Sequence, residues 1–173
     1  MVPKSTKIKV IDFGGATYDR EKKYSVVNTR QYLAPEVILG LGWSTPSDLW
    51  SAGCIVAELY FGELLFATHD NTEHLALMER CVGPFPRGML GRSGTNGDAF
   101  DSRGWHRMGC VLSSSSLAHV RKMGPLEGIV TERDRPSGLV ELLRALLKAD
   151  PRYRATAEEA LRHTFCSRVR VER

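Results

Sequence analysis

The chain has 173 residues, enough for one globular domain with a hydrophobic core and too few for two domains of average size. Hydrophobic residues make up 42% and charged residues 25%, which excludes wholesale disorder and a fibrous repeat. No run approaches the roughly 18 uncharged apolar residues of a membrane span, and residues 1–7 lack the apolar core of a secretory signal. The net charge of +4 has no dominant patch behind it. We therefore expect neither a membrane nor a direct nucleic-acid partner.

The four cysteines, at positions 54, 81, 110 and 166, lie too far apart for a zinc knuckle or a redox pair. Their mostly apolar or basic neighbours indicate buried free thiols, which suit a reducing compartment such as the cytosol or nucleus. The five histidines show no metal-ligand spacing either, so we expect them to cap, pack or face solvent.

The front of the chain reads as a strand, a loop and a short helix. Residues 7–11 alternate and then run apolar, which predicts a short strand that ends in a glycine turn. Residues 16–35 have no period and predict a loop. Pro35 then opens a short helix that ends before Gly40, because proline is tolerated in the first turn and glycine accepts left-handed angles after the last one.

Two longer helices follow. Residues 47–61 are apolar almost all round, which predicts a helix that is buried on most sides. Residues 72–82 place their apolar side chains near one face, and Gly83 and Pro84 end that pattern. Together these helices predict the centre of the molecule.

Residues 84–136 carry many glycines and little periodicity, which predicts a long irregular insert. Phe100 and Trp105 are the expected anchors of this insert, and we interpret the serine run 113–116 as a flexible link. The insert separates the central helices from the last ones.

The end of the chain reads as helical. Residues 137–148 predict a strongly amphipathic helix. Thr156 and Glu159 form a capping-box pattern, in which each side chain satisfies the other residue's backbone N–H, so the last helix should begin there. We expect residues 168–173 to be frayed. The predicted fold is therefore mainly α, with one strand at the front.

Four short motifs occur in the order in which protein kinases carry them. Residues 12–14 read Asp-Phe-Gly, residues 34–36 Ala-Pro-Glu, residues 48–53 Asp-Leu-Trp-Ser-Ala-Gly and residues 150–154 Asp-Pro-Arg-Tyr-Arg. One such motif is a weak signal, but the series is strong, and the chain resembles the protein kinases. The resemblance implies the C-terminal lobe of a kinase fold, with no N-terminal lobe. Its parts would be a strand and activation segment (7–36), central helices (47–83), an irregular insert (84–136) and C-terminal helices (137–166).

Residues 73–80 read Glu-His-Leu-Ala-Leu-Met-Glu-Arg, which is similar to the EHLAMMER signature of the LAMMER, or Clk-type, kinases and departs from it only at Leu77. This resemblance implies a Ser/Thr or dual-specificity kinase that uses ATP and Mg²⁺. Its implied substrates are proteins, among them Arg/Ser-rich splicing factors. It also implies a protein that is monomeric when complete and is nuclear or cytoplasmic, with the nucleus favoured.

By resemblance, Asp12, Phe13 and Gly14 belong to the nucleotide site, with Asp12 as the catalytic Mg²⁺ ligand. Mg²⁺ prefers one or two carboxylates together with phosphate oxygens and water, which an aspartate on a glycine-flanked turn can serve. Taken without the other motifs, a turn-forming or capping aspartate is the simpler interpretation of Asp12.

Three charged residues have implied structural roles. The residues that match Glu36 and Arg154 form a buried ion pair in kinases, and the planar guanidinium suits two-point binding of a carboxylate. The alternative is two solvated charges that contribute under about 1 kcal/mol. Asp48 would hold the backbone of the catalytic loop, although helix capping explains an aspartate there equally well.

The segment before residues 34–36 carries the implied substrate site. Thr29 would reach the catalytic aspartate, and Arg30 and Tyr32 would shape the pocket for the residue after the phosphorylated one. Leu33 stands where LAMMER kinases usually have arginine, and Asn28 stands where serine is common, so substrate preference and one phosphorylation site are in doubt. The hydroxyls that remain as candidate phosphorylation sites are Tyr18, Tyr24, Ser25 and Thr29.

Phosphoryl transfer also needs a glycine-rich loop, a strand lysine and the aspartate and asparagine of the catalytic loop. None of these motifs occurs in the sequence, and residues 1–10 contain no Asp or Asn. We therefore expect the chain to be the C-terminal part of a kinase domain and to be inactive alone. We also expect an open apolar surface that favours aggregation or partner dependence.

Two alternative functions stay open at this point. The chain could be a non-catalytic kinase-lobe remnant that acts as a protein-binding module. A basic RNA-associated domain ranks lower, because it would require a salt-sensitive affinity for RNA.

Overall fold

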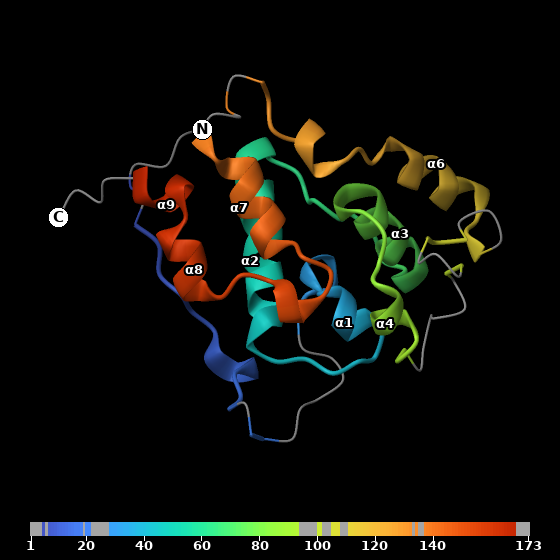
Figure 1. Cartoon of the computed structure of the whole chain (residues 1–173), viewed down its shortest axis with the longest axis horizontal. Helices are drawn as coiled ribbons and strands as arrows, with labels where there is room; N and C mark the ends of the chain where they lie inside the picture. The colour runs from blue at the N-terminus through green and yellow to red at the C-terminus, as the bar shows by residue number, and fades with distance from the viewer. Residues whose placement is uncertain are drawn as a thin grey trace.

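The computed structural model describes residues 5, 7–18, 20–21, 28–93, 100–101, 105–107, 111–132, 134 and 137–168. Its described part is helical (Figure 1). The α-helices are α1 (Pro35–Ile38), α2 (Thr45–Phe61), α3 (Asn71–Val82), α4 (Arg87–Leu90), α6 (Ser114–Lys122), α7 (Leu139–Leu146), α8 (Ala157–Arg162) and α9 (Thr164–Arg168). The described residues also form the 3-10 turns η1 (Phe13–Gly15) and η2 (Arg30–Tyr32), which precede α1, and η4 (Leu126–Gly128) and η6 (Pro151–Tyr153), which lie between later helices.

Helix α2 runs through the centre of the molecule, with α7 packed against it, as Figure 1 shows. Trp50, Cys54 and Ala57 of α2 are buried. Gly53 permits the close approach of α7, because a Cβ at this position would lie 2.9 Å from Cδ2 of Leu147. The buried helix that the sequence predicts over 47–61 is therefore present and begins two residues earlier, at Thr45.

Replacing Gly53 with alanine should destabilise the protein by about 1–3 kcal/mol, because the added methyl group must push α7 away from α2. Thermal or urea unfolding measures the loss. Gly88, in the short helix α4, is the matched control, since a Cβ there meets nothing within 4 Å. Gly88→Ala should leave stability unchanged or slightly raised. Equal effects of the two substitutions would contradict the packing argument.

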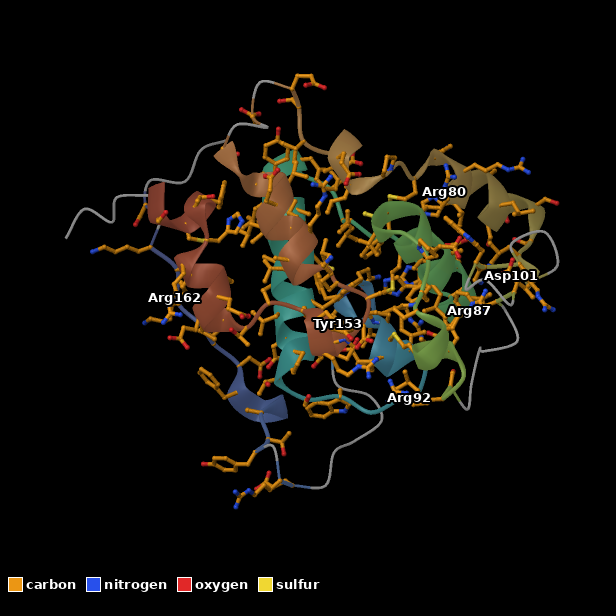
Figure 2. The ribbon with its side chains drawn as sticks, in the orientation of Figure 1. Arg80, Arg87, Arg92, Asp101, Tyr153 and Arg162 are labelled. Atoms are coloured by element: carbon orange, nitrogen blue, oxygen red, sulfur yellow. The ribbon has the colours of Figure 1, made fainter. Side chains whose placement is uncertain are left out.

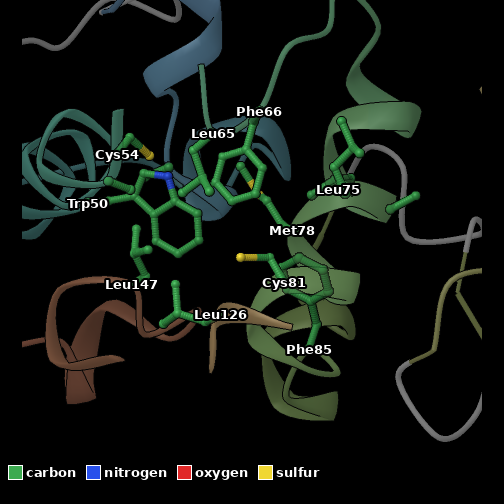
Figure 3. Packing of buried hydrophobic residues seen from close by; sticks show 14 of the residues in the cluster. Trp50, Cys54, Leu65, Phe66, Leu75, Met78, Cys81, Phe85, Leu126 and Leu147 are labelled. Carbon is green, nitrogen blue, oxygen red and sulfur yellow. The ribbon is translucent and has the colours of Figure 1, made fainter. Parts of the chain in front are cut away.

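An aromatic stack links α2 to α3 inside the core (Figure 3). The rings of Trp50 and Phe66 stack with centroids 6.0 Å apart, and Phe66 lies 5.4 Å from the imidazole of His74. Leu75 and Met78 of α3 complete this side of the core. The apolar side of α3, the helix that contains the signature residues 73–80, is therefore buried.

The predicted strand over residues 7–11 is wrong. The described part of the chain contains no strand, and its one isolated bridge joins Phe100 to His106. Ile8, Val10 and Ile11 are between 70% and 90% exposed. A strand is stabilised by pairing and packing with neighbouring strands, and no segment among the described residues pairs with residues 7–11.

The insert over 84–136 is more ordered than its composition predicts, because it contains α4, α6 and η4. Phe100 is buried and packs against Phe85 with ring centroids 5.2 Å apart, so this anchor is correct. Trp105 is 47% exposed, so the second anchor is wrong. The serine run is not a flexible link: the hydroxyl of Ser113 accepts a hydrogen bond from the backbone N–H of Ser116 and caps α6.

The last helices follow local signals. Helix α7 occupies most of the predicted segment 137–148 and buries its leucines. Thr156 and Glu159 form the predicted capping box at the start of α8. Arg168 is the last residue described, so most of the predicted frayed tail, 168–173, lies outside the described residues.

The cysteine thiols at positions 54 and 81 are free and buried, and that of Cys166 is half-buried, while Cys110 lies outside the described residues. Burial raises the pKa of both buried thiols, to about 12 at Cys81. Among the described residues, no helix combines the length and apolar character that crossing a membrane requires.

Candidate functional site

The Asp-Phe-Gly turn at residues 12–14 lies on the surface. Asp12 adopts a left-handed backbone conformation, with φ at 64°, which aspartate tolerates better than most residues. The turn η1 follows at once, closed by a hydrogen bond from the N–H of Ala16 to the carbonyl of Phe13. Asp12 and Phe13 are exposed, so the carboxylate is accessible to a ligand in solution.

A single accessible carboxylate fits a Mg²⁺ ion that takes its other ligands from phosphate oxygens and water. Asp12 could hold such an ion. No group of three or more His, Cys, Asp or Glu side chains in the described part of the chain could form a protein-only metal site. The donor set therefore suits a nucleotide-bound ion rather than a structural metal.

The segment before α1 is fixed to α2 by side-chain hydrogen bonds. The hydroxyl of Tyr32 donates to Oε2 of Glu58 at 2.6 Å, and that of Ser51 donates to the carbonyl of Tyr32 at 2.9 Å. The side-chain amide of Asn28 donates to Ser51 at 3.1 Å. The bond to the Glu58 carboxylate, with partial burial, raises the pKa of Tyr32 to about 12. Tyr32 therefore stays protonated and held at physiological pH.

The same segment is joined to the start of the signature helix α3. The guanidinium of Arg30 donates to Oδ1 of Asn71 at 2.5 Å, and the amide of Gln31 donates to the carbonyl of Thr68 at 3.4 Å. The carboxylate of Asp70 caps α3 by accepting from the backbone N–H of Glu73. Arg30 and Tyr32, which the sequence assigns to the substrate pocket, therefore lie together on a platform made by α2 and α3.

Thr29 and Asp48, two other predicted site residues, are exposed. Asp48 is the fourth residue of α2 rather than its cap, and its carboxylate forms no hydrogen bond with the described residues. Tyr18 is 80% exposed, and the candidate phosphorylation sites Tyr24 and Ser25 lie outside the described residues. No hydrogen bond joins Asp12, Thr29 and Asp48 to one another in the described part of the chain.

Glu36 and Arg154 form the predicted buried pair. Two nitrogens of the guanidinium donate to the two carboxylate oxygens, at 2.6 and 2.8 Å. The side chain of Arg154 is 0% exposed and that of Glu36 is 4% exposed. Further guanidinium hydrogen bonds reach the carbonyls of Pro46, Lys148 and Ala149. This pair fixes the start of α1 to the residue that follows η6, 118 positions away along the chain.

The buried indole of Trp50 covers the guanidinium, which lies 5.2 Å from its ring centroid. Because every donor of Arg154 is occupied and one face is covered by an aromatic ring, the charge is compensated despite its burial. The sequence predicts the ion pair but gives no signal for these additional contacts.

The residues expected from the sequence do not include those that hold the 28–32 segment in place. Ser51 lies inside the recognised motif 48–53, so its position in the sequence could have indicated it. Glu58, Asn71 and Gln31 carry no pattern that distinguishes them from solvated polar residues.

Part of the α2 surface is apolar and open. Ile55 is 45% exposed and Leu59 is 80% exposed, and the two lie one helical turn apart. Phe61 and Leu64, just beyond, are 38% and 37% exposed. This is the kind of uncovered face that the sequence predicts.

The chain is similar in sequence to known protein kinases. Residues 1–166 match the family described as Protein kinase domain. The chain is 49% identical to the serine/threonine-protein kinase AFC2 of Arabidopsis thaliana and 45% identical to the dual specificity protein kinase CLK2 of Homo sapiens. Each alignment covers 98% of this chain. The chain belongs to the LAMMER, or Clk-type, protein kinases.

A crystal structure of a kinase domain superposes on the chain with a TM-score of 0.84 and 43% sequence identity. It covers 94% of this chain, which in turn covers 48% of that domain. The chain spans 40% of the length of AFC2 and 34% of that of CLK2. The helical architecture of this LAMMER chain is thus that of a protein kinase, with the signature residues 73–80 inside α3.

Proposed function

We propose that this chain forms part of a Ser/Thr or dual-specificity kinase that transfers the γ-phosphate of ATP to protein hydroxyls. The observation that carries the proposal is the platform at residues 28–36, where Arg30 and Tyr32 are fixed to α2 and α3 and Glu36 is fixed to Arg154. Such a platform can hold a substrate segment in one position, which is the main protein contribution to phosphoryl transfer.

The proposed roles follow from exposure and contacts. Asp12 presents its carboxylate on the surface turn and would hold Mg²⁺, which neutralises phosphate charge when bound. Thr29 is exposed at the start of η2, next to the fixed residues, and would reach the catalytic aspartate of the complete domain. Arg30 and Tyr32 would border the pocket for the following substrate residue.

Arg/Ser-rich splicing factors are the proposed substrates, on family membership alone, and the proposed setting is the nucleus or the cytoplasm. Leu33 makes the substrate preference distinctive. A guanidinium at this position could pair with an anionic substrate group, whereas leucine cannot. We therefore expect weaker selection for acidic or phosphorylated groups next to the target hydroxyl than in relatives with arginine.

These 173 residues alone should not transfer phosphate, because no glycine-rich loop, strand lysine or catalytic-loop aspartate occurs among them. The test is a transfer assay with labelled ATP and an Arg/Ser peptide. The chain alone should give no signal. A chimaera that supplies the upstream half of the CLK2 kinase domain should be active.

Within the active chimaera, Asp12→Ala should lower kcat by about 10³-fold or more. The substitution removes a ligand of the Mg²⁺ ion that would neutralise negative charge on the transferred phosphate. Glu141→Ala removes an exposed carboxylate on α7 and should leave kcat unchanged. Transfer by the 173 residues alone that disappears with Asp12→Ala would contradict the proposed inactivity. A chimaera insensitive to Asp12→Ala would contradict the metal role.

A second candidate function is a non-catalytic module that binds proteins, favoured by the open apolar side chains of Ile55 and Leu59. A folded chimaera that shows no transfer, together with a partner captured by that face, would select this function over the first. Ile55→Ser with Leu59→Ser should then abolish capture without unfolding the chain.

A further inference from the structure

A large cavity lies away from the Asp-Phe-Gly turn and the activation segment. The cavity lies between the end of α3 with residues 83–86 on one side and α7 with η6 on the other. Its volume is about 740 Å³. That size is typical of ligand sites. Cys81, Leu126 and Leu147 form part of its lining, and all three are buried apolar side chains. Nothing in the proposed phosphoryl transfer uses this cavity.

The acidic side chains of the cavity are already compensated. Asp150 accepts from the guanidinium of Arg152 at 2.6 Å, and Glu127 accepts from Arg144 at 2.5 Å. Glu79 is buried and accepts a backbone N–H from the insert. Burial raises the pKa of Glu79, which disfavours its negative charge. These three carboxyl groups therefore offer little attraction to a cationic ligand.

Two basic side chains of the cavity are not compensated. Arg80 extends from α3 and Lys148 follows α7, so the two walls contribute one cation each. Both residues are exposed, and the side chain of neither forms a hydrogen bond or ion pair with the residues that the structure describes. Arg80 and Lys148 therefore place one cation without an ion-pair partner among the described residues on each side of the apolar side chains of Cys81, Leu126 and Leu147, the floor of the cavity.

Aromatic side chains flank these cations. Trp105 is 47% exposed and Tyr153 is 73% exposed, and both line the cavity. Figure 2 labels Tyr153, on η6, and Arg80, on α3. Exposed Trp, Tyr and Arg side chains are characteristic of protein–protein contact sites, because they supply large, rigid surfaces with a polar end.

We propose that this cavity is a docking site for a short acidic peptide segment of a partner protein. Glutamate or aspartate side chains of that segment pair with Arg80 and Lys148, and an apolar side chain between them packs on the floor. A peptide fits better than a nucleic acid, which needs many phosphate contacts rather than two. The exposure of Trp105, which the composition of the insert does not explain, follows from this role.

Fluorescence anisotropy with the purified 173-residue chain tests the proposal, using a labelled hexapeptide of four glutamates and two leucines. Binding should saturate and weaken as salt is added. The double variant Arg80→Glu with Lys148→Glu should raise Kd about tenfold or more, because both ion pairs become repulsive. The milder double variant Arg80→Gln with Lys148→Gln should also raise Kd, by a smaller factor. Circular dichroism of both double variants checks that the loss of binding is not caused by misfolding.

The matched control is Lys9→Glu with Arg121→Glu, which makes the same change in net charge at exposed positions outside the cavity. It should leave Kd unchanged. A peptide with glutamines in place of glutamates should not bind. The proposal is overturned if the control pair weakens binding as much as the cavity pair, if the glutamine peptide binds equally well, or if a short RNA competes as strongly as the unlabelled acidic peptide.

Discussion

Replacing Arg154 with methionine should lower the free energy of unfolding by about 3–5 kcal/mol, because it leaves the carboxylate of Glu36 buried without its partner. Methionine keeps much of the side-chain volume, so the loss reports the charge and its hydrogen bonds rather than a cavity. The carbonyls of Pro46, Lys148 and Ala149 lose their donors as well. Urea unfolding followed by circular dichroism gives the value.

Two further variants distinguish the effect of the buried Glu36–Arg154 pair from that of an exposed salt bridge. Arg144→Met breaks a pair whose side chains are 50% and 44% exposed, and it should cost under about 1 kcal/mol. Combining Arg154→Met with Glu36→Met removes both charges, so the double variant should be less destabilised than the sum of the two single ones. Additive losses would show that the two residues act independently, against the bidentate geometry.

Acid should unfold the protein through two buried histidines, His74 and His106. Burial lowers the pKa of His74 to about 3 and that of His106 to about 4, from an ordinary 6.5. The unfolded chain therefore binds protons that the folded chain excludes, and stability falls as the pH drops below about 6.5. For one fully buried imidazole the slope is about 1.4 kcal/mol per pH unit. Thermal unfolding between pH 7 and pH 4.5 measures the fall.

The variant His74→Phe should flatten this pH dependence, because an aromatic ring that cannot be protonated keeps the contact with Phe66. His69, exposed and just outside α3, provides the control His69→Phe, which should keep the full slope. Glu79, whose pKa is raised by burial, acts with the opposite sign, since its stabilising effect is fully present at low pH and is lost as the pH rises above 4.5. If the dependence of stability on pH is the same in His74→Phe as in the original chain, His74 is not the cause of the acid sensitivity.

Local signals in the sequence predict most helices. Pro35 with the glycines after α1, the apolar surround of α2 and the capping box at Thr156 all concern contacts within a few residues. Such contacts form in the same way wherever the segment lies. Errors occur where a distant partner decides the outcome. Residues 7–11 alternate as a strand does, but the part of the chain that the structure describes contains no strand to pair with them.

The insert illustrates the same limit. Phe100 and Trp105 are both large aromatic residues in a glycine-rich segment, and only contacts with Phe85 distinguish the buried one from the exposed one. The serines at 113–116 were equally ambiguous, because serine favours both linkers and helix caps. Composition cannot decide between these outcomes.

For the site, the sequence predicts Glu36 with Arg154 through motif order rather than through physical chemistry. It does not predict how Arg30 and Tyr32 are held, because Asn71 and Glu58 are ordinary polar residues until the helices bring them near.

The hydrogen bonds from Arg30 to Asn71 and from Gln31 to Thr68 tie the turn η2 to the first residue of α3 and to the segment just before that helix. That turn therefore inherits its orientation from a helix whose other side is buried in the core. If residues 30–32 border the substrate, as proposed, a substitution at Asn71 would release the guanidinium of Arg30 and so shift the substrate pocket from a residue outside it.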